Sequence, residues 1–184
     1  MLLIASFIFY SFYNPFYSLI LMAVIIINYL GGRYIEKIND QRKKLFVLII
    51  SIVANVWILV SFKYYNFFNN IISNVSGVLN VTNPLPYLNI LLPVGLSFYI
   101  FQAISYVVDI YRNNQTAEKN FGIFSLYLAF FPKLTMGPIE RASDLIHQLK
   151  EKHIFRYESV TNGLKLMLWG FFQKIVIADR IAIY

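Results

Sequence analysis

Residues 45–62 read LFVLIISIVANVWILVSF, a run without a single charged side chain. A helix that crosses the hydrocarbon core of a bilayer needs about 20 mostly apolar residues. Charged residues are also rare on both sides of this run. Residues 45–108 contain Lys63 as their only charged residue, and residues 1–32 contain none. The sequence therefore predicts an integral membrane protein.

The composition of the whole chain supports the same class. The 184 residues are 58% hydrophobic and 14% charged, whereas soluble domains carry about 25% charged residues. The absence of cysteine excludes a disulfide scaffold and a thiolate metal site. The net charge of +7 is typical of basic cytoplasmic loops, and no nucleic-acid-binding motif accompanies it. We expect no metal site and no nucleic-acid partner.

Four apolar segments are long enough to be membrane spans, namely residues 15–31, 45–68, 90–110 and 159–184. Gly31-Gly32 is expected to end the first helix. The basic segment 33–44, with five Lys or Arg residues against two acids, is expected to be cytoplasmic. Residues 69–89 are rich in Asn, Ser and Pro and are expected to form an extracytoplasmic loop.

Two apolar segments are too short to cross. Residues 2–13 would make a helix of about 18 Å and residues 121–131 one of about 16 Å, so the second is predicted to be re-entrant. Residues 139–158 carry mixed charge around an apolar stripe, which predicts an amphipathic helix at the membrane surface. The fold class expected is an all-α, polytopic membrane helix bundle with a short re-entrant element.

Polar side chains follow one face of the span 90–110. At about 100° per residue they fall within an arc of about 80°, and they are Gln102, Ser105, Asp109 and Arg112. Polar residues in a membrane helix usually face the bundle interior or a water-filled cavity. Two interpretations remain open: a cavity lining, or helix–helix hydrogen bonds with an interfacial Asp–Arg pair.

The last span carries a similar stripe with Trp169, Gln173 and Arg180, and Lys174 lies on the opposite side. A Lys at a helix centre costs about 2.5–3.5 kcal/mol on insertion scales. Lys174 and Arg180 are therefore expected in an internal polar environment. The two histidines, His147 and His153, lie in the charged segment 139–158 and are expected at the surface, so no complete catalytic set is visible.

Four motifs resemble the membrane-bound O-acyltransferase family. They are LPVGLSFYIFQ at 92–102 with SYVVDIYR at 105–112, FFPKLTMGPIER at 130–141, GFFQKIVIADR at 170–180, and the weaker FKYYNFF at 62–68. The resemblance is to the bacterial branch of alginate O-acetyltransferases and D-alanyl transfer proteins, and it covers nearly the whole chain.

The resemblance implies a multi-helix enzyme that moves an acyl group to a hydroxyl. It implies acetyl-CoA or another acyl thioester as the donor substrate, with no bound cofactor. The acceptor would be an extracytoplasmic polysaccharide, which the acetyl group would reach with the help of exported acetylation proteins. The protein would lie in the bacterial inner membrane. The family's histidine lies in an apolar helix of the C-terminal half. Neither histidine here fits that setting, so no catalytic residue is assigned.

Residues 1–184 are then expected to form one transmembrane domain, part of a larger one whose first helix and C-terminal half lie outside this sequence. Basic residues beside the short helix would meet donor phosphates or anionic lipid, and the two stripes would wall a tunnel. The residues expected at this entrance are Lys133, Gly137, Pro138 and Arg141. A non-catalytic membrane transporter or assembly subunit is the alternative function.

Overall fold

The structure is a computed structural model that describes all residues except 13, 79–92, 135–136, 138–139, 152–153 and 183–184. The described residues form helices and contain no strand, which confirms the all-α prediction. The chain divides into two units, Met1–Lys150 and Glu151–Tyr184. The prediction of one domain over 1–184 stays a prediction.

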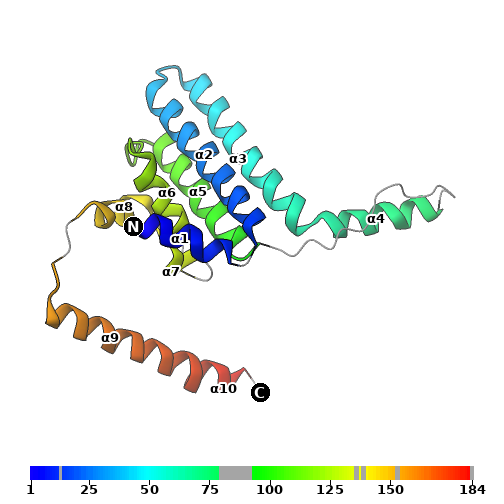
Figure 1. The fold of residues 1–184 in the computed structure, drawn as a ribbon. Helices are drawn as coiled ribbons and strands as arrows, with labels where there is room; N and C mark the ends of the chain where they lie inside the picture. Colours follow the sequence, from blue (N-terminus) through cyan, green and yellow to red (C-terminus); the bar gives the residue numbers. More distant parts are fainter. Residues whose placement is uncertain (13, 79–92, 135–136, 138–139, 152–153, 183–184) are drawn as a thin grey trace. The chain divides into compact units, whose positions relative to one another are not determined.

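The first unit contains eight helices among its described residues (Figure 1). They are α1 (Leu2–Ser11), α2 (Pro15–Lys37), α3 (Gln41–Lys63), α4 (Tyr65–Val78), α5 (Leu96–Tyr111), α6 (Phe121–Ala129), α7 (Phe131–Leu134) and α8 (Ala142–Lys150). The second unit contains α9 (Tyr157–Phe171), the π-helix η1 (Phe172–Ala178) and α10 (Asp179–Ile181).

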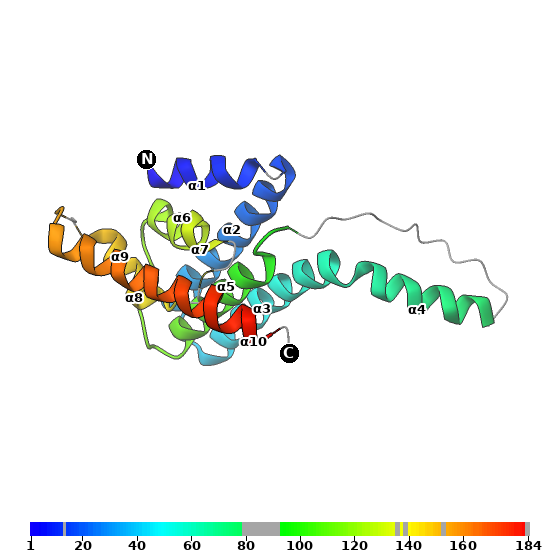
Figure 2. The ribbon, with the colours of Figure 1, turned by 90° about the horizontal axis from the view of Figure 1, so that it is seen from below.

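Helix α2 is the centre of the first unit, because it packs against α1, α3, α5 and α6. Figure 2 shows this bundle from below. Leu21, Val24 and Ile25 of α2 and Ile100 and Val107 of α5 are fully buried in the core. The local sequence starts these helices: the Asn14 side chain caps α2, which begins with Pro15, and the Asp40 side chain caps α3.

Two helices, α2 and α3, are long and apolar enough to cross a membrane, by length and composition. Helix α3 exposes large apolar side chains along its length, including Phe46, Val53 and Trp57, which are 65%, 58% and 72% exposed. Such a surface is unfavourable in water and is matched by lipid. A buried pair holds α2 on α3, in which the amides of Asn28 and Asn55 each donate to the other's oxygen at 3.0 Å.

The expectation that Gly31-Gly32 ends a helix is wrong, because α2 continues to Lys37. The two glycines permit a close approach instead. A Cβ on Gly31 would lie 2.5 Å from the Ser51 Oγ of α3, and a Cβ on Gly32 would lie 2.8 Å from the Tyr106 ring of α5. Small residues at such crossings are characteristic of membrane helix packing.

The segment expected as the loop 69–89 is helical up to residue 78, because α4 covers Tyr65–Val78. The remainder of that segment lies in 79–92, outside the described residues. The short helix expected over 121–131 is present as α6, nine residues long and ending before Phe130. At residues 142–150 an amphipathic helix forms as predicted, but Leu145 and Ile146 are buried, since α8 packs on α6 rather than presenting this stripe to lipid.

Candidate functional site

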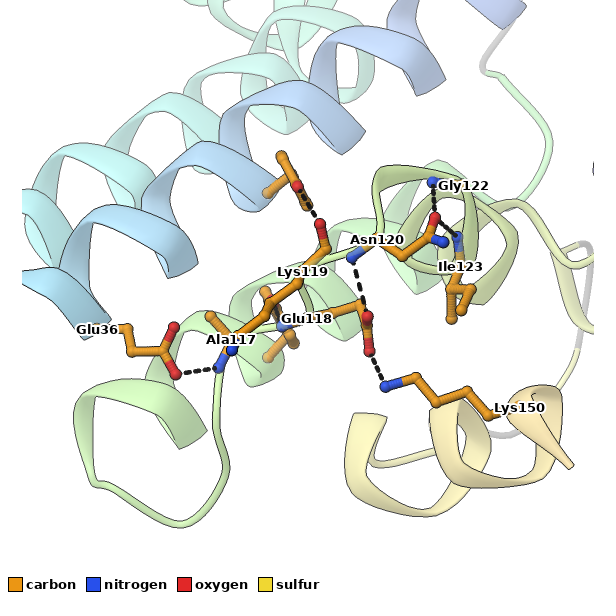
Figure 3. Close-up of polar contacts among 10 residues, drawn as sticks. Glu36, Ala117, Glu118, Lys119, Asn120, Gly122, Ile123 and Lys150 are labelled. Atoms are coloured by element: carbon orange, nitrogen blue, oxygen red, sulfur yellow. Dashed lines mark hydrogen bonds and ion pairs between the residues drawn. The ribbon is translucent and has the colours of Figure 1, made fainter.

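A polar network joins the connection between α5 and α6, residues 112–120, to the rest of the first unit (Figure 3). The N–H of Ala117 donates to Glu36 Oε1 of α2 at 3.2 Å, and the N–H of Glu118 donates to the Tyr106 hydroxyl of α5 at 3.0 Å. The Tyr29 hydroxyl of α2 donates to the Lys119 carbonyl at 2.7 Å. These contacts pin an irregular segment to two helices by its backbone.

The centre of this network is Glu118, whose side chain is 6% exposed. One carboxylate oxygen accepts from the Asn120 N–H at 3.0 Å, and the other lies 2.5 Å from the Lys150 ammonium of α8 (Figure 3). Burial raises the pKa of Glu118, but the hydrogen bonds from Lys150 and Asn120 outweigh burial and hold the pKa below its ordinary value. Glu118 therefore stays ionised and fastens α8 to the connection.

A pocket of about 170 Å³ lies beside this ion pair. It is lined by polar side chains and two apolar ones, namely Gln115, Thr116, Glu118, Ala142, Ser143, Ile146, His147 and Lys150. Pockets that enclose drug-sized ligands are about 300–1,000 Å³, so this one is too small for a whole coenzyme. His147 is exposed on α8, as predicted, and His153 lies outside the described residues.

The polar stripe of α5 passes from the core to the surface. Gln102 is buried, its amide donates to the Tyr127 carbonyl of α6 at 3.2 Å, and the Tyr127 hydroxyl donates back to the Gln102 carbonyl at 3.4 Å. Ser105 and Asp109 are half-buried and Arg112 is exposed. Asp109 accepts from the Asn114 amide at 3.3 Å. Gln102 thus makes a helix–helix hydrogen bond, and whether the stripe lines a tunnel stays a prediction.

The predicted donor entrance lies around α7. The Lys133 ammonium forms an ion pair with the Glu140 carboxylate, so its charge is partly neutralised. Gly137 lies close to the Lys133 backbone, because a Cβ on Gly137 would lie 2.6 Å from the Lys133 Cα. Arg141 is exposed just before α8, and Pro138 lies outside the described residues. The role of this group as an entrance stays a prediction.

The second unit carries Trp169 on α9, Gln173 and Lys174 on η1, and Arg180 on α10, all exposed within the unit. The Lys174 ammonium lies 2.5 Å from Asp179 Oδ1. Lys174 therefore has an ion-pair partner, supplied by the first residue of α10. No surrounding polar environment is seen in this unit's described residues.

The sequence alone does not predict the network around Glu118. The local signal is weak: an acidic residue lies two positions before the helix-capping Asn120, in a chain with nine acidic residues. The partner, Lys150, comes from a distant helix, so no local pattern pointed to it. Among the described residues, no group of three or more His, Cys, Asp or Glu side chains is placed to hold a metal ion.

Comparison with known proteins finds relatives along the whole chain. It is 34% identical to the "Probable alginate O-acetylase AlgI" of Pseudomonas aeruginosa over 187 aligned residues, which cover 99% of this chain and 35% of the relative. It is 30% identical to the "Peptidoglycan O-acetyltransferase" of Helicobacter pylori, covering 98% of this chain and 38% of the relative. The "Probable alginate O-acetylase AlgI" of Azotobacter vinelandii is 32% identical. The chain thus spans about a third of the length of the relatives it matches. No family model and no solved structure matches it.

Proposed function

Since this chain is a homologue of bacterial O-acetylases of alginate and peptidoglycan, we propose that it is the membrane-embedded part of a polysaccharide O-acetyltransferase. This homology confirms the resemblance drawn from the four motifs. The observation that carries the proposal is similarity over essentially the whole chain to proteins whose names share one reaction, the O-acetylation of a glycan. The helical fold with two apolar helices fits a membrane location.

The proposed reaction transfers an acetyl group from a thioester to a hydroxyl. The acceptor oxygen attacks the acetyl carbonyl carbon, a C–O bond forms, the C–S bond breaks, and the hydroxyl proton passes through a general base to the leaving thiolate. We assign the base to no residue of this chain. His147, the histidine in the described residues, is exposed on α8 rather than held in an apolar helix.

We propose that the donor is acetyl-CoA or another acyl thioester, approaching from the cytoplasm beside α7. Arg141 is exposed there, and its guanidinium suits bidentate contact with phosphate. Lys133 is less available because Glu140 pairs with it. Exported acetylation proteins would then carry the acetyl group to the acceptor polysaccharide outside the inner membrane.

The test is the ester-linked acetate of the envelope polysaccharides in a strain that lacks the gene. Deletion is expected to remove the acetate, and the intact gene to restore it. In membranes supplied with radiolabelled acetyl-CoA, Arg141→Ala is expected to raise the apparent KM for the donor about tenfold, as expected for one charge-assisted hydrogen bond. Lys119→Ala, an exposed lysine on the α5–α6 connection, is the matched control.

Unchanged acetate after deletion would contradict the proposal. A transporter or assembly subunit would instead leave acetyl transfer intact in detergent extracts of the deletion strain, while export of the polysaccharide falls. The two functions are therefore separated by measuring transfer and export in the same strain.

A further inference from the structure

Helix α4, Tyr65–Val78, is amphipathic, and the large apolar side chains along one of its sides are exposed. Phe67, Phe68, Ile71 and Ile72 are 58%, 49%, 44% and 41% exposed. At about 100° per residue these four positions fall within an arc of about 140° on one side of the helix. The helix thus presents a continuous apolar face, which water would not favour.

The opposite side of α4 is made of amides and a hydroxyl. Asn66, Asn69, Asn70, Ser73 and Asn74 fall within another arc of about 140°. Asn69 is 1% exposed, and Asn66 and Ser73 are half-buried. The helix contains no charged residue. The apolar and polar residues therefore occupy separate sides of the helix, and the polar side is only partly buried, because Asn70 and Asn74 are exposed.

The position of α4 in the chain places it at a membrane boundary. Helix α3 spans Gln41–Lys63, about 34 Å at 1.5 Å per residue, which exceeds the ~30 Å hydrocarbon core. Its first turn carries Arg42, Lys43 and Lys44, and its last turn carries Lys63. Polar residues at both ends put Lys63 at the far boundary. Helix α4 starts two residues later, after Tyr64 (Figure 2).

The surroundings of this junction are those of a lipid–water interface. The Lys63 ammonium lies 5.5 Å from the centre of the Tyr64 ring, and the Phe67 and Phe68 rings contact each other with centres 5.6 Å apart. Aromatic rings and snorkelling lysines gather at this depth of a bilayer. At 14 residues, about 21 Å, α4 is too short to cross the core itself.

We propose that α4 is an interfacial helix that lies on the bilayer and inserts the face of Phe67, Phe68, Ile71 and Ile72 among the lipid chains. The occupant of this face is lipid, because the preceding helix brings α4 to the interface and the side chains of this face are both apolar and exposed. Interfacial helices usually add attraction between basic residues and anionic lipid. Helix α4 has no charge, so its insertion depends on apolar burial alone and is independent of lipid charge.

The test uses the absence of cysteine from the chain, which allows a single spin label at each chosen position. The labelled protein is reconstituted in nanodiscs of phosphatidylcholine, and collisions with oxygen and with a water-soluble nickel chelate are measured. Ile71→Cys is expected to favour oxygen and Asn74→Cys the chelate. Trp57→Cys, exposed on α3, is the reference for a lipid-facing position in the membrane core.

The expected order of the oxygen-to-chelate ratio is Trp57→Cys, then Ile71→Cys, then Asn74→Cys, unchanged when a third of the lipid is phosphatidylglycerol. Phe68→Cys should match Ile71→Cys and guards against a local effect of one label. If Ile71→Cys is as accessible to the chelate as Asn74→Cys, α4 lies in water and the proposal is wrong. If both apolar positions are shielded from both probes, a protein segment covers the face, which also overturns it. Neither outcome depends on acetyl transfer.

Discussion

Gly32 sets how closely α2 approaches α5. The missing side chain leaves room for the Tyr106 ring and for Ile110, each of which would lie 2.8 Å from an added Cβ. The Tyr106 hydroxyl also accepts a hydrogen bond from the Glu118 N–H. We therefore predict that Gly32→Ala forces the ring away and destabilises the fold by about 1–3 kcal/mol, lowering Tm by about 2–4 °C per kcal/mol in a chain of this size.

The measurement is thermal unfolding in detergent, followed by circular dichroism. Gly163→Ala on α9 is the matched control, since among the described residues nothing beyond its chain neighbours and its own helical backbone lies within 4 Å of its added Cβ. Alanine is preferred over glycine in a helix by about 0.5–1 kcal/mol, so this variant should unfold at the same temperature or slightly higher. An equal Tm for Gly32→Ala and wild type would contradict the prediction, because it would mean that the α2–α5 contact accommodates an added methyl group without loss of stability.

The ion pair between Glu118 and Lys150 gives stability a predictable pH dependence. Because the folded-state pKa of Glu118 lies below its ordinary value of 4.5, its contribution is complete above that value and is lost as the pH falls through the folded-state pKa. Lys150→Met removes the main partner and leaves burial dominant, which raises the pKa. We predict that Lys150→Met lowers the free energy of unfolding by about 1–3 kcal/mol at pH 7. This difference from wild type becomes smaller as the pH falls toward 4.

The narrowing is measured as the Tm difference between variant and wild type at several pH values from 4 to 8. Lys119→Met removes a neighbouring exposed lysine and should give a difference that does not change with pH. A constant offset for Lys150→Met across this range would show that the lysine acts by packing and not by charge.

At the scale of single residues, sequence alone predicted side-chain type better than side-chain partner. For Gln102 the sequence leaves open a cavity lining or a helix–helix hydrogen bond; the side chain is buried, as a polar residue inside an apolar helix needs a hydrogen-bond acceptor. Its acceptor, the Tyr127 carbonyl, comes from the next helix and has no local signature. The same limit applies to the pairing of Lys133 with Glu140, because no local sequence pattern indicates that these two charges meet.

At the scale of elements, the end of the chain departs from the α-helical period that sequence reasoning assumed. Residues 172–178 are π-helical, and a π-helix bonds residue i to residue i+5. Positions 174 and 179 then lie one turn apart on the same face, whereas in an α-helix they would be about 140° apart. Arg180, which follows the π-helical segment, therefore does not lie on the same face as Trp169 and Gln173, where an α-helix would place it.

The ion pair between Lys174 and Asp179 predicts how substitutions affect membrane insertion of the expected span 159–184. Asp179→Asn leaves the Lys174 ammonium without its carboxylate, and an isolated Lys near a helix centre costs about 2.5–3.5 kcal/mol on insertion scales. We expect a lower membrane-inserted fraction for Asp179→Asn, measured with a glycosylation reporter in microsomes. The double variant with Lys174→Gln should restore insertion because it removes the ammonium as well.

Glu158→Gln, which removes an acid from the exposed first turn of α9, is the control and should insert like wild type. Equal insertion of Asp179→Asn and wild type would mean that Lys174 reaches water by another route.

The boundaries of elements could be predicted where a capping residue precedes an apolar run, as Asp40 does before α3. They could not be predicted where tertiary packing decides. Gly31 and Gly32 carry the sequence signature of a helix end, yet the neighbouring helices use their small size for contact. In α4, the many asparagines suggested a loop, because amide side chains compete with backbone hydrogen bonds, while the spacing of Phe67 and Ile71 already held a helical period.

At the scale of the whole molecule, the ends of α3 must lie on opposite sides of the membrane if its 23 residues cross it. Basic residues near helix ends orient membrane proteins with those ends in the cytoplasm. The segment 33–44 holds five of them, so we expect it inside and α4 outside. The matched pair of single-cysteine variants is Lys43→Cys and Asn70→Cys, both at exposed positions.

In intact spheroplasts, a membrane-impermeant maleimide should modify Asn70→Cys at once and Lys43→Cys only after permeabilisation. Replacing Arg42, Lys43 and Lys44 by Gln should raise the fraction of inverted molecules, because the orienting charge is then lost. Modification of both cysteines from outside would show that α3 does not cross. Modification of Lys43→Cys alone would show the opposite orientation. A thioester donor would then reach Arg141 from the other side of the membrane.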